Sequence, residues 1–415
     1  MSEESDRAGI ARHGRLKRPN PVTGVLVVVA MALAVLLVSG ASVAALAVWQ
    51  LTTEVSANSI DLNGADEADA PINIGSYEDG FNILIVGVDN DAAQGAAYGV
   101  RETALNDVNI LVHVSADHSN AVVVSIPRDL IVEHPECTNA DTGEVFEAMS
   151  AAPINEAMSR GGLPCVVNTV SGLTGLDIPF AGVVSFSGVV QMSDAVGGVP
   201  ICLSAPIDDP DAGLNLPEGT NVVSGENALA FLRSRHGVGD GSDLSRISSQ
   251  QLYLASLMRT VQSNGTLTDV PKLLSLANAA AKNIKLSTNL AHADTMVSMA
   301  LALKDIDLSR LVFVQYPGTT DDPDFPGKVV PTQDLADTMF GKIAADEPFS
   351  LTPAEPTEPT EEPEAPVVAD PPVDVPADPS ATDAPAATPT PTPEALDGLT
   401  GITGTDESCA QASGN

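Results

Sequence analysis

Arginines gather in one short stretch of a strongly acidic chain. The 415 residues contain 19 Lys and Arg against 55 Asp and Glu, a formal net charge of −36 at pH 7. Three arginines nevertheless share the stretch FLRSRHGVGDGSDLSRISSQQ: Arg233, Arg235 and Arg246. Guanidinium groups hold phosphate oxygens in a bidentate manner, and a protein of this charge would otherwise repel an anion. The stretch therefore predicts a phosphate-binding site; pairing of these arginines with surface acids is the alternative.

Spacing decides how the first two arginines can act together. Arg233 and Arg235 would point about 200° apart on one helix, so they could not share a target there. We therefore expect the helix that starts at Ser224 to end near Arg233, and Gly237 and Gly239 favour that stop. Arg235 on the exit loop can then turn towards the same ligand as Arg233.

A second group of polar residues follows at helical spacing. Asp243, Arg246 and Gln250 stand at positions i, i+3 and i+7, which lie on one face of a helix. Ser242 is a suitable N-cap, so this face begins at a helix N-terminus, which favours anions. The spacing indicates that the three side chains line the arginine site; a solvated polar stripe on an amphipathic helix is the alternative.

Two acids and one arginine mark the ends of three apolar, β-branched runs. Asp89 closes the first run, Asp107 opens the second, and Arg128 ends the third and is followed by Asp129. Acids at the ends of adjacent strands can share a hard cation such as Mg²⁺; ordinary turn chemistry is the alternative at Asp89. Strand ends are where α/β folds place their sites. The sequence contains no nucleophile elbow, P-loop or dinucleotide fingerprint, so transfer at a metal-held phosphate is the simplest chemistry.

Strands that alternate with helices must position these residues, and they predict a layered α/β domain over residues 81–348. The strand runs are continuously apolar, which is typical of strands buried on both faces. The expected strands cover 81–89, 107–115, 121–129, 178–184, 199–204 and 310–317, and the expected helices cover 151–160, 163–173, 224–233, 243–263, 268–282, 287–304 and 331–344.

An apolar N-terminal segment predicts a membrane anchor. Residues 21–49 carry no charge and are long enough to cross a bilayer, which needs about 20 apolar residues. Several cationic residues precede them, so the positive-inside rule makes residues 1–20 cytoplasmic and residues 50–80 an extracellular spacer. We therefore expect a single-pass cell-membrane protein whose folded domain lies outside. A cleaved signal peptide is the alternative.

The composition changes again near the C-terminus. Residues 349–395 are rich in Pro, Thr and Glu, and such a segment is expected to be an extended, disordered linker. Residues 396–415 are more apolar and are expected to dock back onto the domain; a disordered end is the alternative.

Four cysteines in an oxidising compartment favour two disulfides, and the sequence allows three pairings. Cys137 and Cys165 bracket one loop-and-helix segment, which favours Cys137–Cys165 and leaves Cys202–Cys409. The second pair would tie the C-terminal segment to the domain. A free Cys409, or one bridged to another chain, is the alternative.

Several short motifs occur in a recognisable order. They are Gly87-Val88-Asp89, Asn106-Asp107-Val108, Ile126-Pro127-Arg128-Asp129, Ile154-Asn155-Glu156-Ala157, Gly197-Gly198-Val199, the segment 228–235, and Asp243 with Arg246 and Gln250. This series resembles the LytR-CpsA-Psr family, in its actinobacterial form, over residues 80–260. The resemblance implies a layered α-β-α domain with a central mixed sheet, and an apolar lipid tunnel between the sheet and the helices.

The resemblance also implies an activity. Members are Mg²⁺-dependent phosphotransferases that take a glycopolymer from a polyprenyl diphosphate carrier. They attach it to peptidoglycan through a phosphodiester, typically at a muramic acid 6-hydroxyl. The polymer would be arabinogalactan in a mycolate-type actinobacterium, and otherwise a teichoic acid or capsule-like polymer.

The same resemblance assigns roles to residues. Asp89 and Asp107 would hold Mg²⁺. The residues expected to act in catalysis, with the four arginines gripping the diphosphate, are Arg128, Arg233, Arg235, Arg246, Asp243 and Gln250. Many members carry arginine where this chain has Leu105 and Ser249, so the pocket is expected to be less cationic than in relatives; Arg101 is the candidate substitute for the first.

Other functions would need only some of these features. A non-catalytic polyprenyl-phosphate carrier would keep the arginines without needing both acids. A structural wall-anchoring protein would use the proline-rich tail, and hydrolysis of the diphosphate by water would be a side reaction of the transferase. Nucleic-acid binding is not expected, because it needs a basic face and this chain is acidic.

Overall fold

The computed structural model describes Leu26, Met31 and residues 59–62, 79–89, 104–140, 142–235, 237–239, 241–263, 280, 283–291, 293–304, 306–352 and 393–412. The chain divides into two compact units, Met1–Thr53 and Glu54–Asn415, and the elements below belong to the second. The predicted membrane segment 21–49 lies outside the described residues apart from Leu26 and Met31. No helix formed by the described residues is long and apolar enough to cross a membrane.

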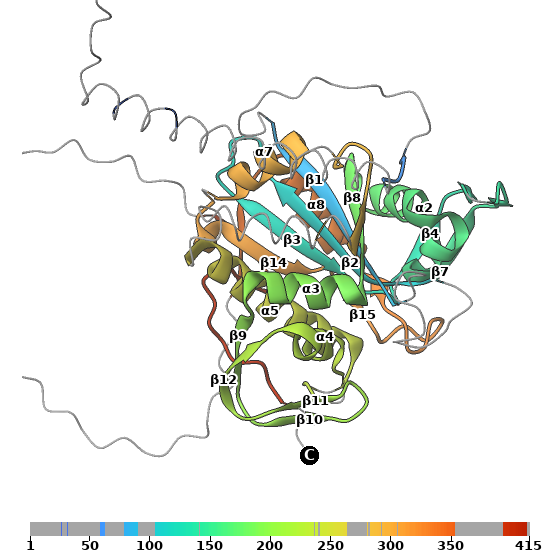
Figure 1. Cartoon of the computed structure of the whole chain (residues 1–415). Helices are drawn as coiled ribbons and strands as arrows, with labels where there is room; N and C mark the ends of the chain where they lie inside the picture. Colours follow the sequence, from blue (N-terminus) through green and yellow to red (C-terminus); the bar gives the residue numbers. More distant parts are fainter. Residues whose placement is uncertain are drawn as a thin grey trace, which may run out of the picture. The chain divides into compact units, whose positions relative to one another are not determined.

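Seven strands form a mixed sheet at the centre of the second unit (Figure 1). In spatial order they are β13 (Ile284–Leu286), β8 (Phe180–Ser185), β1 (Phe81–Val88), β2 (Asn106–Val114), β3 (Ala121–Ile126), β14 (Leu311–Gln315) and β19 (Gly401–Thr403). β1 is parallel to β8 and β3 is parallel to β14, whereas the other neighbours are antiparallel. Apolar side chains such as Leu84, Leu111 and Val124 are fully buried. The predicted strands that begin at 81, 107, 121, 178 and 310 are present, with slightly shifted ends.

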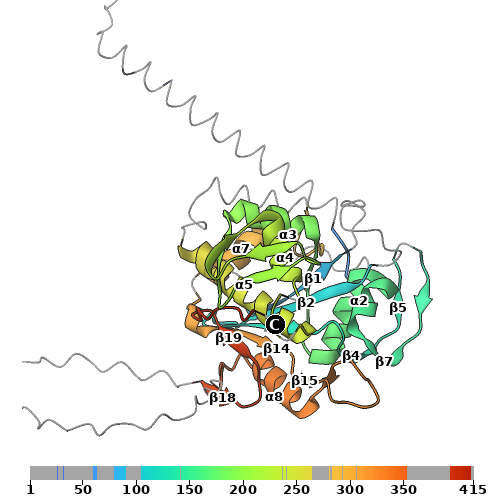
Figure 2. The ribbon, with the colours of Figure 1, turned by 90° about the horizontal axis from the view of Figure 1, so that it is seen from below.

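Helices cover both faces of the sheet. α2 (Ala157–Thr174) and α8 (Gln333–Ala344) share one aliphatic core with β1, β2, β3 and β14. Figure 2 shows, on the opposite side of the sheet from α8, the helices α3 (Phe186–Val196), α4 (Gly225–Arg233), α5 (Asp243–Ser263) and α7 (Ala293–Lys304). The expected α/β fold with a central mixed sheet is therefore confirmed.

A second, smaller core carries the arginine-bearing segment. β9 (Val199–Leu203) pairs with β12 (Gly219–Val223), and β10 (Ile207–Asp209) pairs with β11 (Leu214–Leu216). Their apolar side chains surround Phe231 of α4, which is fully buried. This burial fixes α4 before the helix ends at Arg233, as the sequence predicts.

The segment before α2 differs from the prediction of a helix at 151–160. Met149–Pro153 form β7, which pairs with β4 (Ile131–His134), and Ile154–Glu156 form the short 3-10 helix η2. Pro153 is extended, with φ −60° and ψ 134°, and a residue before a proline avoids the helical region. The helical prediction is therefore wrong in its first half.

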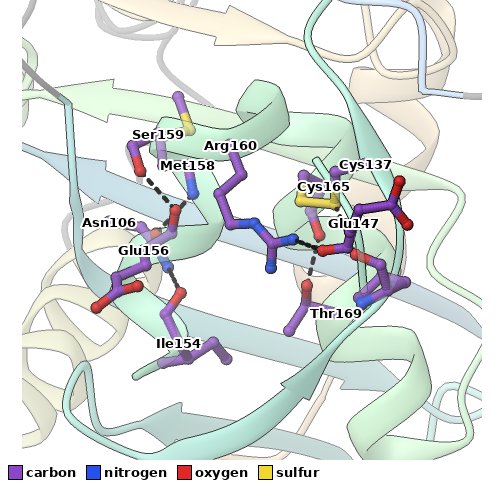
Figure 3. The surroundings of a disulfide bond; sticks show 11 residues. Asn106, Cys137, Glu147, Ile154, Glu156, Met158, Ser159, Arg160, Cys165 and Thr169 are labelled. Carbon is purple, nitrogen blue, oxygen red and sulfur yellow. Dashed lines mark hydrogen bonds between the residues drawn. A yellow bond between two sulfur atoms is a disulfide. The ribbon is translucent and has the colours of Figure 1, made fainter. Parts of the chain in front are cut away.

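The first disulfide joins the strand that begins at Cys137 to α2 (Figure 3). Cys137 begins β5 (Cys137–Thr138), which pairs with β6 (Val145–Phe146), and it is bonded to Cys165 of α2 with the Cα atoms 5.6 Å apart. Beside it, a guanidinium nitrogen of Arg160 donates a hydrogen bond to the carbonyl of Glu147. This is the cysteine pairing that the sequence favours.

The C-terminal segment returns to the domain. β17 (Phe349–Leu351) pairs in parallel with β18 (Glu394–Leu396), and β19 extends the central sheet beside β14. The second disulfide joins Cys202 to Cys409. The expected linker at 349–395 is thus too long at both ends, because β17 and the start of β18 belong to the folded unit.

Two other predicted boundaries differ as well. The helix expected from 287 begins at Ala293, because Ser287 forms a parallel bridge with Ile60 and a hydrogen-bonded turn from Ser287 to Ala291 follows it. Before this bridge, Ile284–Leu286 pair with β8 as β13. The helix expected at 268–282 lies outside the described residues apart from Ala280. The final helix begins at Gln333, and the short elements before it are η3 (Leu308–Arg310), β15 (Gly318–Thr319) and β16 (Val330–Pro331).

Candidate anion-binding site

Strand directions bring three predicted site residues to one edge of the sheet. β2 runs antiparallel to both β1 and β3, so the carboxyl ends of β1 and β3 meet the amino end of β2. Asp89 directly follows β1, Asp107 is the second residue of β2, and Arg128 lies just beyond β3. Residues that are far apart in sequence therefore share one site.

A β-bulge sets the direction of Asp107. Gly87 pairs with Val108 whereas Val88 pairs with Asn106, so Asp107 is the extra residue in its strand. Bulges re-aim side chains and are frequent next to active sites. Gly87 suits the close crossing, because a Cβ there would lie 2.9 Å from the Cβ of Val108. The two strands can therefore approach at the point where Asp107 turns out of register.

Asn106 fixes the chain immediately before Asp107 (Figure 3). Its fully buried side chain donates a hydrogen bond to the carbonyl of Ile154 at 3.1 Å. It donates another to Oδ1 of Asn109 at 2.7 Å. Its Oδ1 accepts from the backbone N–H of Met158 at 3.2 Å. Asn106 thus ties β2 to the start of α2, a role that its presence in a motif did not reveal.

Arg128 is held by three carboxylates. Its Nη1 lies 2.6 Å from Oδ1 of Asp107, and its Nε lies 3.5 Å from Asp129 and 3.4 Å from Asp243. Burial favours the neutral form of Arg128, but the hydrogen bond with Asp107 and the charges of the three carboxylates outweigh it and raise its pKa. Asp129 is itself 2.6 Å from Nζ of Lys328. Arg128 is therefore a fixed cation at the strand edge.

Asp243 lies among three arginines. Its Oδ1 is 2.7 Å from Nη2 of Arg246, 3.4 Å from Nε of Arg128 and 3.5 Å from Nη2 of Arg235. The side chains of Arg128 and Arg235 are 22% and 34% exposed, whereas that of Arg246 is 7% exposed. The two more exposed guanidinium groups can therefore meet a ligand, while the buried one holds the carboxylate.

Arg246 also joins α5 to the sheet. Its Nη2 donates a hydrogen bond to the carbonyl of Asp107 at 3.1 Å. Burial lowers the pKa of Arg246. The charge of Asp243 acts to raise this pKa, whereas the positive charges of Arg235 and Arg128 lower it further. A cavity of about 10 Å³ lies among these residues and is bordered by Asp107, Arg128, Asp243, Arg246 and Gln250. The site is thus closely packed beneath its exposed arginines.

Gln250 has a supporting role. Its Nε2 donates a hydrogen bond to the carbonyl of Leu232 at 3.0 Å, which joins α5 to the last turn of α4. Gln250 and Arg246 are each 6% exposed, so the alternative of a solvated polar stripe on this helix is wrong. Gln250 borders the small cavity, as the sequence predicts, but its amide nitrogen is committed to the backbone.

Arg233 reaches a different part of the same edge. Its guanidinium carbon lies 5.0 Å from the centroid of the Phe186 ring. Phe186 directly follows Ser185, which pairs with Val88, the residue before Asp89. Arg233 therefore lies at the strand ends near Asp89, while Arg235 joins the cluster around Asp243. The change of direction between the two arginines follows the predicted end of α4.

Asp89 and Asp107 are the two candidate metal ligands. Asp89 is 5% exposed and follows β1, and Asp107 lies at the neighbouring strand end. Among the described residues there is no group of three or more His, Cys, Asp or Glu that could hold a metal ion. A pair of carboxylates is nevertheless the donor set that Mg²⁺ uses when substrate phosphates and waters complete its shell. Asp89 and Asp107 fit such a shared ion and not a cage made by the protein alone.

A much larger cavity lies away from the arginines. It measures about 740 Å³ and is bordered by residues 131–135, 148–150, Asn168, Thr169, Gly172, Leu173, Pro331 and Gln333. None of these residues is Lys or Arg, and Glu133 is acidic, so the cavity offers no lysine or arginine to a phosphate. We therefore place the anion site at the exposed guanidinium groups of Arg128 and Arg235, above the smaller, arginine-lined cavity.

Comparison with known proteins identifies the family. A family model described as LytR_cpsA_psr family matches residues 46–339, which is more than half of the chain. The chain belongs to the LytR-CpsA-Psr family. The departures at two positions can now be located: Leu105 precedes β2, and Ser249 is buried in α5 with its hydroxyl on the carbonyl of Ser245 at 3.4 Å.

Curated relatives are similar over most of the chain. "Cell wall biosynthesis protein LcpA" of Corynebacterium glutamicum is 33% identical over 322 residues, which cover 71% of this chain and 60% of that protein. "Polyisoprenyl-teichoic acid–peptidoglycan teichoic acid transferase TagT" of Bacillus subtilis is 24% identical over 314 residues, covering 74% of this chain and 90% of that protein. This LytR-CpsA-Psr protein thus matches less than two thirds of the length of the Corynebacterium protein.

Solved structures share the fold. Protein gbs0355 from Streptococcus agalactiae has a TM-score of 0.53 at 22% identity, over 65% of this chain and 88% of that one. A "LytR-Csp2A-Psr enzyme" from Actinomyces oris has a TM-score of 0.50 at 19% identity, over 69% of this chain and 94% of that one. Both similarities support the same central mixed sheet.

Proposed function

We propose that this LytR-CpsA-Psr protein is a membrane-anchored phosphotransferase of the cell envelope. It would move a glycopolymer from a polyprenyl diphosphate carrier to peptidoglycan, through a phosphodiester to a muramic acid 6-hydroxyl. One observation carries the proposal: Arg128, Arg235 and Arg246 surround a single carboxylate at a sheet edge of a protein with net charge −36. The names of relatives, which include a polyisoprenyl-teichoic acid–peptidoglycan teichoic acid transferase, support the substrate class.

The arginines have separate tasks in this proposal. Arg128 and Arg235, the more exposed pair, grip the diphosphate, and Arg233 extends the cationic edge towards Asp89. Arg246 keeps Asp243 and the start of β2 in place from below. Fixed guanidinium groups are most valuable where negative charge grows in the transition state, which here is the leaving polyprenyl phosphate.

The reaction is a direct displacement at phosphorus. The acceptor hydroxyl oxygen attacks the phosphorus bonded to the glycan, and the bond from that phosphorus to the bridging oxygen of the polyprenyl phosphate breaks. Asp129 or Asp243 takes the hydroxyl proton, since both carboxylates lie beside Arg128. Mg²⁺ held by Asp89 and Asp107 would supply additional positive charge to the diphosphate. Water in place of the sugar hydroxyl would give hydrolysis as a side reaction.

The membrane anchor and the lipid path are both proposed from the sequence. Residues 21–49 would anchor the protein with the folded unit outside, next to the polyprenyl carrier. The lipid would follow an apolar path between the sheet and its helices. This path is a prediction from the family resemblance. Both features agree with a substrate that is itself bound to the membrane.

The direct test supplies the full-length protein with Mg²⁺, peptidoglycan and a defined polyprenyl diphosphate glycan. Donors with arabinogalactan-type and teichoic-acid-type glycans are compared, and mass spectrometry looks for the muramic acid phosphodiester. Arg235→Ala should abolish the product without unfolding the protein, whereas Arg310→Ala, a half-buried position in η3, should not. Lipid binding without Mg²⁺-dependent release of polyprenyl phosphate would favour a carrier and overturn the proposal.

A further inference from the structure

The loop between α4 and α5 sets the position of two site residues. Residues 234–242 join Arg233, the last residue of α4, to Asp243, the first residue of α5. Arg235 lies in this loop, and its guanidinium reaches Asp243 at 3.5 Å. Whatever fixes the loop backbone therefore also fixes the exposed arginine of the anion site.

A buried acid that the sequence did not single out lies beneath this loop. Asp209, the last residue of β10, is 1% exposed. Its Oδ2 accepts hydrogen bonds from Oγ of Ser234 at 2.7 Å and from the backbone N–H groups of Arg235 and Gly237, each at 3.3 Å. Its Oδ1 accepts from the N–H groups of Asp211 and Ala212, each at 3.1 Å.

The surroundings of Asp209 favour its charged form. Burial acts to raise the pKa of this carboxyl, but the hydrogen bonds from Ser234, Ala212, Gly237 and Arg235 outweigh burial and lower it. A buried carboxylate that accepts several donors leaves those donors unsatisfied when it is removed. The loop also touches β10 closely, because a Cβ on Gly237 would lie 2.5 Å from Cγ2 of Ile207 and 3.2 Å from Cβ of Asp209.

The C-terminal segment holds the same loop further along. The N–H of Gly239 donates a hydrogen bond to the carbonyl of Gln411 at 2.9 Å, and Val238 and Ala412 form an antiparallel bridge. Ala410 is bonded in turn to Cys202 and Ser204 through backbone hydrogen bonds of 2.9 and 3.1 Å. Asp209 thus holds the first half of the loop and the C-terminal segment holds the second.

We propose that Asp209 is a positioning residue for the transfer reaction, which holds the backbone at Ser234, Arg235 and Gly237 so that the Arg235 guanidinium meets the diphosphate. Asp209 acts only through Arg235, because its carboxylate is buried beneath the loop and does not reach the substrate. This inference rests on the proposed function for its substrate, but the contacts that carry it are within the protein.

The test compares two adjacent acids. Asp209→Asn keeps the shape of the side chain and removes its charge. Asp208→Asn changes an exposed neighbour, whose carboxylate accepts a long hydrogen bond of 3.4 Å from the side-chain amide of Asn215. Asp209→Asn should lower kcat/KM for the donor about 100-fold, since small misplacements of a substrate-holding group have effects of that size. Asp208→Asn should match the wild type. Ser234→Ala, which removes one donor to Asp209, should give a smaller loss in the same direction and replaces Asp209→Asn if that variant does not fold.

A double-mutant cycle separates positioning from general stability. Because Arg235→Ala is expected to abolish transfer, the cycle is read in the binding of inorganic pyrophosphate with Mg²⁺. In an Arg235→Ala background, Asp209→Asn should weaken this binding no further, because its effect passes through the missing arginine. Losses that multiply, or wild-type kinetics in Asp209→Asn, would overturn the inference. Binding of inorganic pyrophosphate with Mg²⁺ is measured in the same proteins. If the wild type transfers no glycan, the proposed function fails, and weaker pyrophosphate binding by Asp209→Asn than by Asp208→Asn still tests the positioning role.

Discussion

Nη1 of Arg128 lies 2.6 Å from Oδ1 of Asp107, so a carboxylate proposed to hold the metal also holds an arginine of the diphosphate site. The two residues come from different strands and meet only because β2 and β3 are antiparallel neighbours. Such a pair couples metal binding to the position of a guanidinium, since the carboxylate must satisfy both partners.

Asp107→Asn should therefore impair two functions at once. The amide binds Mg²⁺ poorly and leaves Arg128 without its shortest ion pair, so transfer should fall by about 100-fold or more. The Mg²⁺ concentration for half-maximal activity should also rise. Asp177→Asn is the matched control, because Asp177 is exposed and precedes β8 at the opposite edge of the sheet. An unchanged Mg²⁺ requirement in Asp107→Asn would contradict the metal assignment.

Asp243→Asn should destabilise the protein when no anion is bound. Three guanidinium groups lie within 3.5 Å of one carboxylate oxygen, and removing its charge leaves them to repel one another. We expect the free energy of unfolding to fall by about 3 kcal/mol, the usual result of breaking a buried ion pair from one side. Inorganic pyrophosphate should stabilise the variant more than the wild type in denaturant unfolding, because the added anion replaces the lost charge. Equal stabilisation would mean that the anion binds elsewhere.

The two disulfides should differ in their contribution to stability. Cys202–Cys409 joins residues 207 apart in sequence, whereas Cys137–Cys165 joins residues 28 apart. Chain entropy predicts that the longer loop stabilises the fold by about 2 kcal/mol more. Denaturant unfolding of Cys409→Ser and Cys165→Ser should give this order. Cys409→Ser should also increase hydrogen exchange at Gly239, whose N–H is bonded to Gln411; protection equal to the wild type would show that β19 holds the segment without the disulfide.

Buried histidines should make the fold sensitive to acid. Burial lowers the pKa of His113, against an opposing contribution from Asp346, and burial together with the charge of Arg160 lowers the pKa of His134. The unfolded chain then binds protons below about pH 6.5 that the folded chain does not, so stability falls as pH falls from there towards the folded pKa values. His134→Gln should flatten the dependence of unfolding free energy on pH in this range. The same slope in variant and wild type would contradict this account.

Some predictions succeeded because the signal was local. The end of α4 was predicted because Arg233 and Arg235 cannot share a target on one helix. The start of α5 was predicted because polar residues repeat at helical spacing from Asp243. The sheet strands follow from continuous runs of β-branched residues. The start of α2 was misjudged because Met149–Pro153 pair with β4, a partner that periodicity alone does not reveal. β19 was missed as a strand for the same reason, since Gly401–Thr403 become a strand only beside β14.

The amino-acid sequence by itself determined which residues are proposed to carry the chemistry. Arginines are scarce in this acidic chain, and their spacing relative to Asp243 marks an anion site before any contact is known. Only the tertiary structure decided which contacts, and so which role, each of these residues has. Arg233 lies over Phe186 while Arg235 faces Asp243, Gln250 holds the backbone, and Asp209 supports the loop from below. These roles depend on burial and on contacts between distant segments, whereas spacing along the chain reports only local geometry.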